Sequence, residues 1–211
     1  MTRRRKGSSR RWLAEHHSDA YVKRARAEQW RSRAVFKLAE LDDKYRLLKP
    51  GMTVVDLGAA PGGWSQYAAQ RIGRGGRVFA LDLLEMPPLA GVDLIRGDFR
   101  ESGPLAALET ALGGHQVDLV LSDMAPNISG VAAVDQPRAM ALAELAAEFA
   151  IERLKPGGDF LVKVFQGEGF DAFVAGIRRQ FGKVVIRKPD ASRPRSREVY
   201  LLARDAAKQS V

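Results

Sequence analysis

Residues 54–64 read VVDLGAAPGGW, an apolar run that passes directly into a turn of small residues. The run is typical of a buried β-strand, and the tryptophan at its end begins a segment with helical spacing. Small residues allow a ligand to approach the backbone closely, and the N-terminus of a helix favours electron-rich groups. Because ligands of open α/β sheets bind beyond the carboxyl ends of the strands, residues 58–63 are predicted to form a nucleotide-type cofactor loop.

The chain around this loop alternates between β-rich and helical segments. Parallel strands need crossover helices, so the alternation predicts an α/β fold with a mostly parallel sheet covered by helices on both faces. Residues 187–198, RKPDASRPRSRE, have no helical pattern, which permits a terminal hairpin with an antiparallel last strand. The predicted strands are 53–57, 77–82, 93–96, 117–122, 159–165, 183–187 and 198–203, and the predicted helices are 34–45, 64–71, 104–112, 137–154 and 170–180.

Length and composition narrow the class of protein. A chain of 211 residues with 45% hydrophobic content suits one buried core and is too short for two comfortable domains. No stretch has the apolar length of a membrane span or of a secretory signal, so we expect a soluble, cytoplasmic protein, with an organellar transit peptide as the alternative. We also expect a monomer. The chain has 0 Cys, which excludes disulfides, thiolate metal sites and cysteine nucleophiles, and we expect no metal site.

The charge indicates a polyanionic partner. The formal net charge is +9, and the excess is concentrated in residues 3–11, 23–33 and 187–197. Such clusters favour nucleic acid over a merely soluble basic protein, because each cation that meets a phosphate releases condensed counterions. Residues 3–11 are interpreted as a disordered arm that adds affinity, with a simple solvated tail as the alternative.

Two aspartates follow successive predicted strands near the cofactor loop. Asp82 is suited to hold ribose hydroxyls, and Asp98 could accept a hydrogen bond from an adenine amino group. Either alone is often an ordinary strand-end residue, but their joint position favours a cofactor site. NAD is disfavoured, since Ala60 replaces the second glycine of the dinucleotide fingerprint.

Polar residues also occur where a core strand would not hold them. Lys163 lies within the apolar run FLVKVF, and burying an unpaired ammonium is costly, so it is either functional or paired, unless it reaches solvent at a strand end. Glu198 is a candidate partner, and Asp123 directly follows a predicted strand. Lys37, on the first predicted helix, would by itself be an ordinary solvated lysine.

Five segments resemble the FtsJ-type ribosomal RNA 2′-O-methyltransferases, in the order typical of that family. They are SRAVFKL (32–38), DLGAAPGGWSQY (56–67), SDMAPNISG (122–130), VKVFQGEGF (162–170) and SREVY (196–200). The resemblance extends from about Trp30 to Ala203. It implies a Rossmann-like, seven-stranded methyltransferase domain over residues 30–205, which leaves a basic, flexible extension at 1–29 and a tail at 206–211.

The same resemblance implies S-adenosylmethionine as cofactor and methylation of a ribose, with a uridine of large-subunit ribosomal RNA as the expected target. The implied catalytic tetrad is Lys37, Asp123, Lys163 and Glu198, and the implied cofactor contacts are Gly62, Trp64, Asp82, Asp98 and Asp123. Because a ribose hydroxyl is a poor nucleophile, it must be aligned and then lose its proton to a positioned base. Neutral Lys163 is the candidate base; alternatively it only stabilises negative charge on the oxygen while water takes the proton.

Two features favour oxygen as the methyl acceptor. The lack of cysteine disfavours methylation at C5 of a pyrimidine, and DMAPN (123–127) lacks the aromatic residue common in enzymes that methylate base nitrogens. Arg31, Arg33 and residues 187–197 are predicted to guide an RNA backbone, with ribosomal RNA or the large ribosomal subunit as partner and no membrane. The alternatives are another RNA such as tRNA, a non-catalytic ribosomal RNA-binding assembly factor, and an NAD-dependent oxidoreductase.

Overall fold

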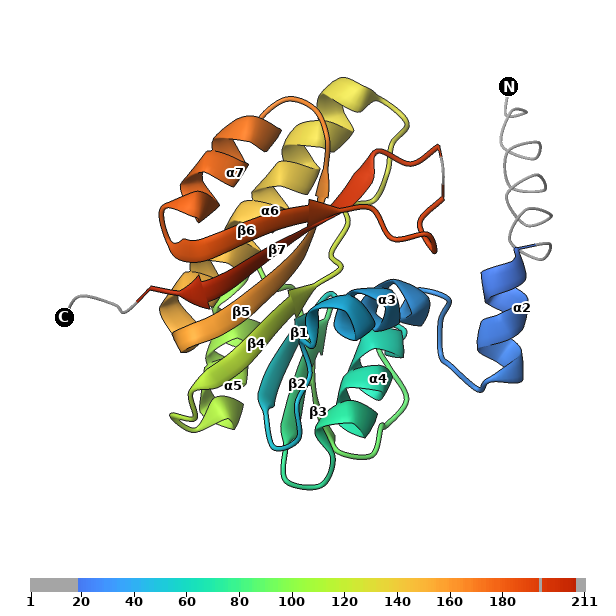
Figure 1. The fold of residues 1–211 in the computed structure, drawn as a ribbon, viewed down its shortest axis with the longest axis vertical. Coiled ribbons are helices and arrows are strands. Elements are labelled where there is room, and N and C mark those ends of the chain that lie inside the picture. Colours follow the sequence, from blue (N-terminus) through green and yellow to red (C-terminus); the bar gives the residue numbers. More distant parts are fainter. Residues whose placement is uncertain (1–18, 194, 208–211) are drawn as a thin grey trace.

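The computed structural model describes residues 19–193 and 195–207, and its centre is one seven-stranded sheet (Figure 1). The strand order is β3-β2-β1-β4-β5-β7-β6. Neighbouring strands are parallel except around β7, which lies between β5 and β6 and runs antiparallel to both. The strands are β1 (Thr53–Leu57), β2 (Arg77–Asp82), β3 (Val92–Arg96), β4 (Val117–Ser122), β5 (Leu154–Phe165), β6 (Phe181–Arg187) and β7 (Glu198–Ala206).

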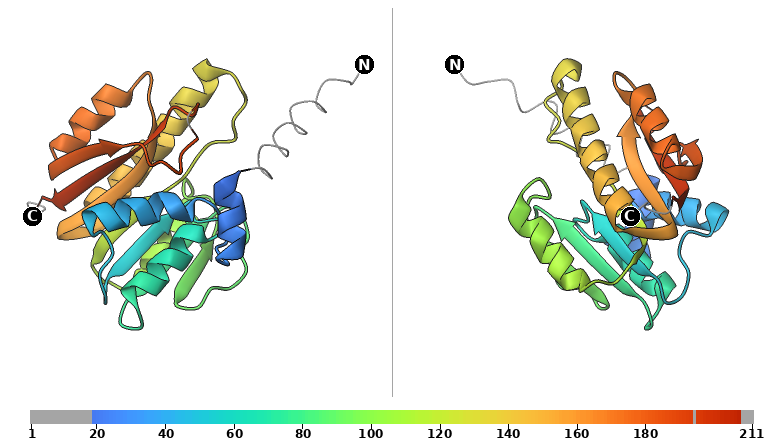
Figure 2. Two further views of the ribbon diagram at one scale, coloured as in Figure 1. Left: turned by 45° about the vertical axis from the view of Figure 1, so that its right-hand side comes forward. Right: turned by 90° about the vertical axis from the view of Figure 1, so that its left-hand side faces the viewer.

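Helices cover both faces of the sheet (Figures 1 and 2). Successive strand side chains point to opposite faces, so Val54 joins the core beneath α3 and α4 while Val55 joins the core beneath α5, α6 and α7. The predicted α/β fold with an antiparallel last strand is therefore confirmed. Within the part of the chain described here, no helix is both long and apolar enough to cross a bilayer. The helices are α2 (Ala20–Ala27), α3 (Val35–Tyr45), α4 (Gly63–Ile72), α5 (Ser102–Leu112), α6 (Ala132–Arg153) and α7 (Phe170–Arg178).

Two element starts differ from the sequence prediction by five residues, and the others by two residues at most. β5 begins at Leu154, five residues early, because an irregularity in its pairing with β4 lets the KPGG segment join the strand. α6 begins at Ala132 rather than at Pro137, which therefore lies inside the helix. Proline is favoured in the first turn of helices, so the sequence predicted that this helix begins at Pro137, five residues after its actual start.

The segment before Trp30 also differs from the prediction of a flexible extension through residue 29. Asp19 caps α2 by accepting a hydrogen bond from the backbone amide of Tyr21 at 2.9 Å, and Val22 and Ala25 are buried. This helix was not predicted because basic residues are so frequent in the segment that its short amphipathic pattern is inconspicuous. Residues 3–11, the predicted arm, lie outside the described residues; at the other end, β7 reaches Ala206, one residue into the predicted tail.

Candidate active site

The cofactor loop packs directly against the chain that follows β4. Gly58 has φ +76°, and a Cβ there would lie 2.6 Å from Cγ and 2.9 Å from Cα of Met124. Only glycine fits this contact, since a larger residue would push apart the ends of β1 and β4. The tight approach places the loop next to Asp123.

Acidic side chains line the carboxyl ends of β2 and β3. Asp82 accepts hydrogen bonds from the backbone amides of Ala60 at 2.9 Å and Leu84 at 2.7 Å. Asp98 pairs with Arg100 at 2.5 Å, and hydrogen bonds from that residue lower the pKa of Asp98 to about 2. Asp82 is thus held against the cofactor loop and Asp98 is fixed by Arg100 after the neighbouring strand, while their contacts with a cofactor stay a prediction.

Trp64 and Gly62 have surroundings that the sequence did not indicate. The Trp64 side chain is buried, and its indole nitrogen donates to the carbonyl of Ala34 at 2.8 Å. The indole therefore positions the start of α3, and the cofactor contact of Trp64 stays a prediction. A Cβ at Gly62 would lie 3.0 Å from Cδ of Arg31, whose guanidinium donates to the carbonyls of Pro87 and Pro88 at 2.8 and 2.7 Å. Arg31, which the sequence placed on the predicted RNA surface, thus joins the cofactor loop to the segment after β2 and is not among the residues that line the basic pocket beside Lys37.

The four side chains of the predicted tetrad lie together in one hydrogen-bonded chain. Nζ of Lys37 lies 2.7 Å from Oε1 of Glu198 and donates to the hydroxyl of Tyr200 at 3.1 Å. The Tyr200 hydroxyl donates to Oδ1 of Asp123 at 2.7 Å. Nζ of Lys163 lies 3.0 Å from the same oxygen and donates to the Asp123 carbonyl at 2.5 Å. Residues 161 positions apart in the sequence therefore meet, although their catalytic role stays a prediction.

Tyr200 is the member of this hydrogen-bonded series that the sequence did not indicate. It lies two residues after Glu198 on β7, so both side chains point to the same face, and it is the register partner of Lys163 on β5. Burial, followed by the nearby carboxylates of Asp123 and Glu198, raises the pKa of Tyr200 well above its ordinary value. The phenol is therefore a neutral donor that links the two lysines through Asp123.

Asp123 is an anion held between two cations. Burial by itself raises its pKa, but the ammonium groups of Lys163 and Lys37 and the hydrogen bond from Tyr200 outweigh burial, so the pKa of Asp123 lies below its ordinary value. A buried carboxylate with such partners is fixed in orientation as well as in charge. The site thus presents a fixed carboxylate between two lysines.

A second buried carboxyl lies beneath the cofactor loop. Oδ2 of Asp56 accepts a hydrogen bond from the Ser65 hydroxyl at 2.6 Å, while Oδ1 has no partner among the described residues. Burial raises the pKa of Asp56 from 3.8 to about 7, assisted by the negative charges of Asp123 and Asp82. This group changes charge near neutral pH.

Asp56→Asn should flatten the pH dependence of stability. Because the pKa of Asp56 is higher in the folded protein than in the unfolded chain, stability decreases as pH rises from about 4 to about 7 and remains lower above it. The loss attributable to this carboxyl is roughly 4 kcal/mol at most, and Asn has no charge to bury. Urea unfolding at pH 5 and pH 8 measures the difference; an equal loss in both proteins would contradict it.

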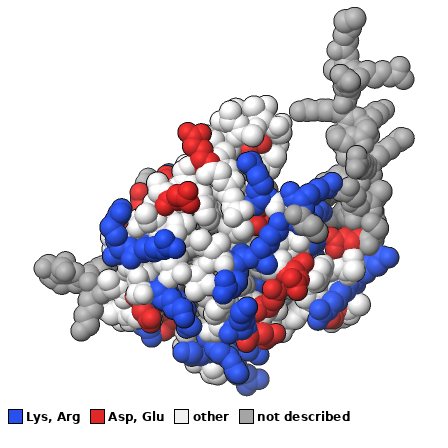
Figure 3. Space-filling model, turned by 45° about the horizontal axis from the view of Figure 1, so that its top comes forward, with Lys and Arg blue, Asp and Glu red and all other residues white. Residues whose placement is uncertain are grey.

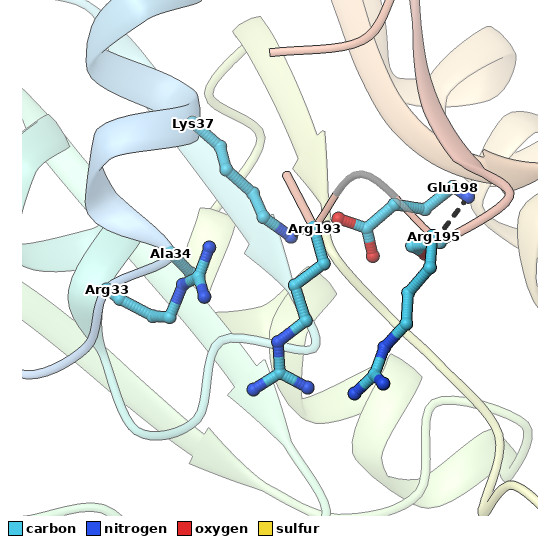
Figure 4. A pocket seen from close by; sticks show the side chains of 7 residues that line it. Arg33, Ala34, Lys37, Arg193, Arg195 and Glu198 are labelled. Atoms are coloured by element: carbon cyan, nitrogen blue, oxygen red, sulfur yellow. Dashed lines mark hydrogen bonds and ion pairs between the residues drawn. The ribbon is translucent and has the colours of Figure 1, made fainter. Parts of the chain in front are cut away.

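A basic pocket opens beside Lys37 and Glu198. Its volume is about 350 Å³, and Figure 4 shows Lys37 and Glu198 pointing toward each other while Arg193 and Arg195 extend side by side. The Arg33 guanidinium stabilises one side of this pocket by donating hydrogen bonds to the carboxylate of Asp19 and to the carbonyl of Ala191. Figure 3 shows Lys and Arg side chains in a band across this part of the surface. The pocket is lined by Arg33, Ala34, Lys37, Arg193, Arg195, Ser196 and Glu198.

Comparison with known proteins gives consistent matches over most of the chain. The family described as FtsJ-like methyltransferase matches residues 30–206. Ribosomal RNA large subunit methyltransferase E of Alkalilimnicola ehrlichii is 64% identical over 202 residues, which are 96% of this chain and 97% of the relative. The protein of the same name from Stenotrophomonas maltophilia is 64% identical over 198 residues, 94% of each chain.

Solved structures also match. A Plasmodium falciparum protein described as a ribosomal RNA methyltransferase by similarity is 27% identical with a TM-score of 0.76, and the match covers 84% of this chain and 98% of that one. Human methyltransferase-like protein 13, solved with SAH, is 14% identical with a TM-score of 0.56 over 84% of this chain and 82% of that one. This second match supports the fold alone.

Proposed function

Because the chain belongs to the FtsJ-like methyltransferase family, we propose that it transfers a methyl group from S-adenosylmethionine to a ribose 2′-hydroxyl, in a uridine of large-subunit (23S) ribosomal RNA. The observation that carries the proposal is the hydrogen-bonded chain from Glu198 through Lys37, Tyr200 and Asp123 to Lys163. It lies at the sheet edge where the cofactor loop meets the end of β4. The tetrad assignment is part of this proposal.

The residues around the cofactor loop fit S-adenosylmethionine. A carboxylate offers about four acceptor sites, so Asp82 can hold two backbone amides and still accept ribose hydroxyls. Asp98 would accept from the adenine amino group, and the Asp123 carboxylate suits the positive end of the cofactor. Gly58 and Gly62 let the loop pack closely against Met124 and Arg31, which fixes the course of the backbone beside Asp82 and Asp123. When bound, the cofactor supplies an electrophilic methyl group on a sulfonium.

The lysines and carboxylates would then act on the ribose. We assign Lys163, acting in its neutral amine form, as the base that takes the proton from the 2′-hydroxyl, since the carbonyl and the carboxylate of Asp123 both orient its nitrogen. Lys37, held by Glu198 and Tyr200, would bind the acceptor oxygen or its neighbour. Alignment of the hydroxyl with the methyl group would supply a further part of the acceleration.

The basic pocket supports RNA as the substrate class. Arg193, Arg195 and Arg33 surround the entrance to Lys37, which suits a phosphate backbone that passes the reacting ribose. The relatives are named for the large ribosomal subunit, and we therefore propose that the substrate is ribosomal RNA, either free or in the assembled subunit. We further propose that the protein acts as a monomer in the cytoplasm.

Incubation with labelled S-adenosylmethionine and unmethylated large ribosomal subunits tests this function. We expect label at one nucleotide whose 3′ bond resists alkaline cleavage, because a methylated 2′-oxygen cannot attack the phosphate. Label on a base, with the backbone still cleavable there, would refute ribose methylation. Titration with S-adenosylmethionine and with NADH tests the cofactor, and only the former should bind.

A further inference from the structure

Exposed apolar side chains gather on the loop between β4 and α6. Ile128 is 62% exposed, Val131 is 55% exposed and Val134, just inside α6, is 38% exposed. Single exposed apolar residues are common, but three within seven positions form a local patch. The patch is close to the proposed active site, since the five residue-to-residue steps from Asp123 to Ile128 span at most about 18 Å.

Hydrogen bonds fix the shape of this loop. Asp135 accepts from the backbone amide and the hydroxyl of Ser129, both at 2.8 Å, and from the amide of Gly130 at 2.9 Å. The Ser129 hydroxyl oxygen also accepts from the amide of Val131 at 3.2 Å. The backbone between Ile128 and Val131 is thus tied to the first turn of α6. Their exposure is a property of an ordered loop.

The base of the loop is tied to the strand that bears Lys163. Nε2 of Gln136 donates to the carbonyls of Phe165 and Glu168, both at 3.0 Å, at the end of β5. The loop leads to α6 on one face of the sheet, whereas Lys37 and Arg33 approach from the start of α3 on the other (Figures 1 and 2). The apolar patch and the basic pocket therefore flank the lysines and carboxylates from opposite sides.

We propose that Ile128 and Val131 form an apolar wedge that packs against the bases next to the target nucleotide and holds its ribose open toward Lys163. This proposal rests on the proposed function. A ribose within folded RNA becomes accessible when its neighbours are unstacked, and unstacked bases pack on apolar side chains. RNA is favoured over a protein partner because the basic pocket lies across the same site.

The double variant Ile128→Ser/Val131→Ser tests the wedge. Both side chains are largely exposed, so the fold and the affinity for S-adenosylmethionine should be unchanged, while kcat/KM on large subunits falls about tenfold, as when a base is deprived of its stacking partner. Leu94→Ser, at a 36% exposed residue of the edge strand β3, is the matched control and should retain full activity. A double variant as active as the wild type would overturn the wedge.

Salt dependence separates the wedge from the basic pocket. The double variant removes no charge, so the slope of log kcat/KM against log salt should equal that of the wild type. Arg193→Gln/Arg195→Gln should reduce that slope by about 0.7–0.9 for each phosphate that the arginines no longer neutralise. A reduced slope in the serine variant would contradict an apolar contact.

Cross-linking identifies what the wedge contacts. A photoreactive amino acid at position 128, irradiated with large subunits, should join to RNA within a few nucleotides of the methylated ribose. A cross-link to a ribosomal protein instead would overturn the proposal in favour of a protein contact. If the wild-type protein methylates no ribose, the proposed function fails, whereas a methylating wild type with an unaffected serine variant removes the wedge alone.

Discussion

Lys163→Met should lower the single-turnover rate of methyl transfer roughly 10²–10⁴-fold, the range that a general base contributes. Methionine fills the position of the lysine on β5, where the side chain is 8% exposed, without supplying an amine. Asp123 keeps the hydrogen bond from Tyr200, so the carboxylate is still oriented. The expected loss is therefore in the chemical step. Quenched-flow measurements with saturating S-adenosylmethionine and subunits give the rate, and calorimetry gives the cofactor affinity.

Lys163→Arg is the control that separates a base from a fixed positive charge. Arginine retains the charge but cannot lose its proton in a protein. If Lys163 takes the proton from the hydroxyl, the arginine variant should be nearly as slow as the methionine variant. An arginine variant within about tenfold of the wild type would show that the positive charge suffices, with water accepting the proton.

The sequence predicted those parts of the site whose residues conflict with their local pattern. Lys163 is an ammonium inside an apolar strand, and Asp123 follows a strand end where a ligand would bind, so both are conspicuous. Lys37 has no such conflict, because a lysine on a helix is usually solvated. Lys37 reaches the site because α3 packs against α4, where the Trp64 indole donates a hydrogen bond to the carbonyl of Ala34. Only the resemblance to a family identified it.

Other features of the site were not predicted because their residues agree with the local sequence pattern. A tyrosine in a core strand is ordinary, so Tyr200 was not distinguished from its apolar neighbours until the register with Lys163 was known. Arg31 belonged to a basic cluster, yet its guanidinium is directed to two carbonyls after β2 by tertiary structure. Local patterns determined the order of strands and helices, whereas side-chain direction at the site depended on contacts between distant segments.

Lys37→Met and Glu198→Gln should each lower kcat/KM strongly, and the double variant should be no less active than the less active single variant. The two side chains are 11% and 15% exposed and form a 2.7 Å ion pair. Removing one partner leaves the other charge largely buried and uncompensated, whereas removing both avoids that cost. We therefore expect the double variant to resist urea better than Lys37→Met, with a coupling energy of about 0.5–3 kcal/mol.

Kinetics on the four proteins of this cycle decide how the pair acts. If Glu198 serves to hold Lys37 at the Tyr200 hydroxyl, then its removal matters only while Lys37 is present, and the effects on kcat/KM are not additive. Additive effects would mean that each side chain contacts the RNA separately, because independent contacts contribute their free energies independently. Non-additivity would assign Glu198 as a positioning residue and leave Lys37 and Lys163 as the amines that meet the ribose.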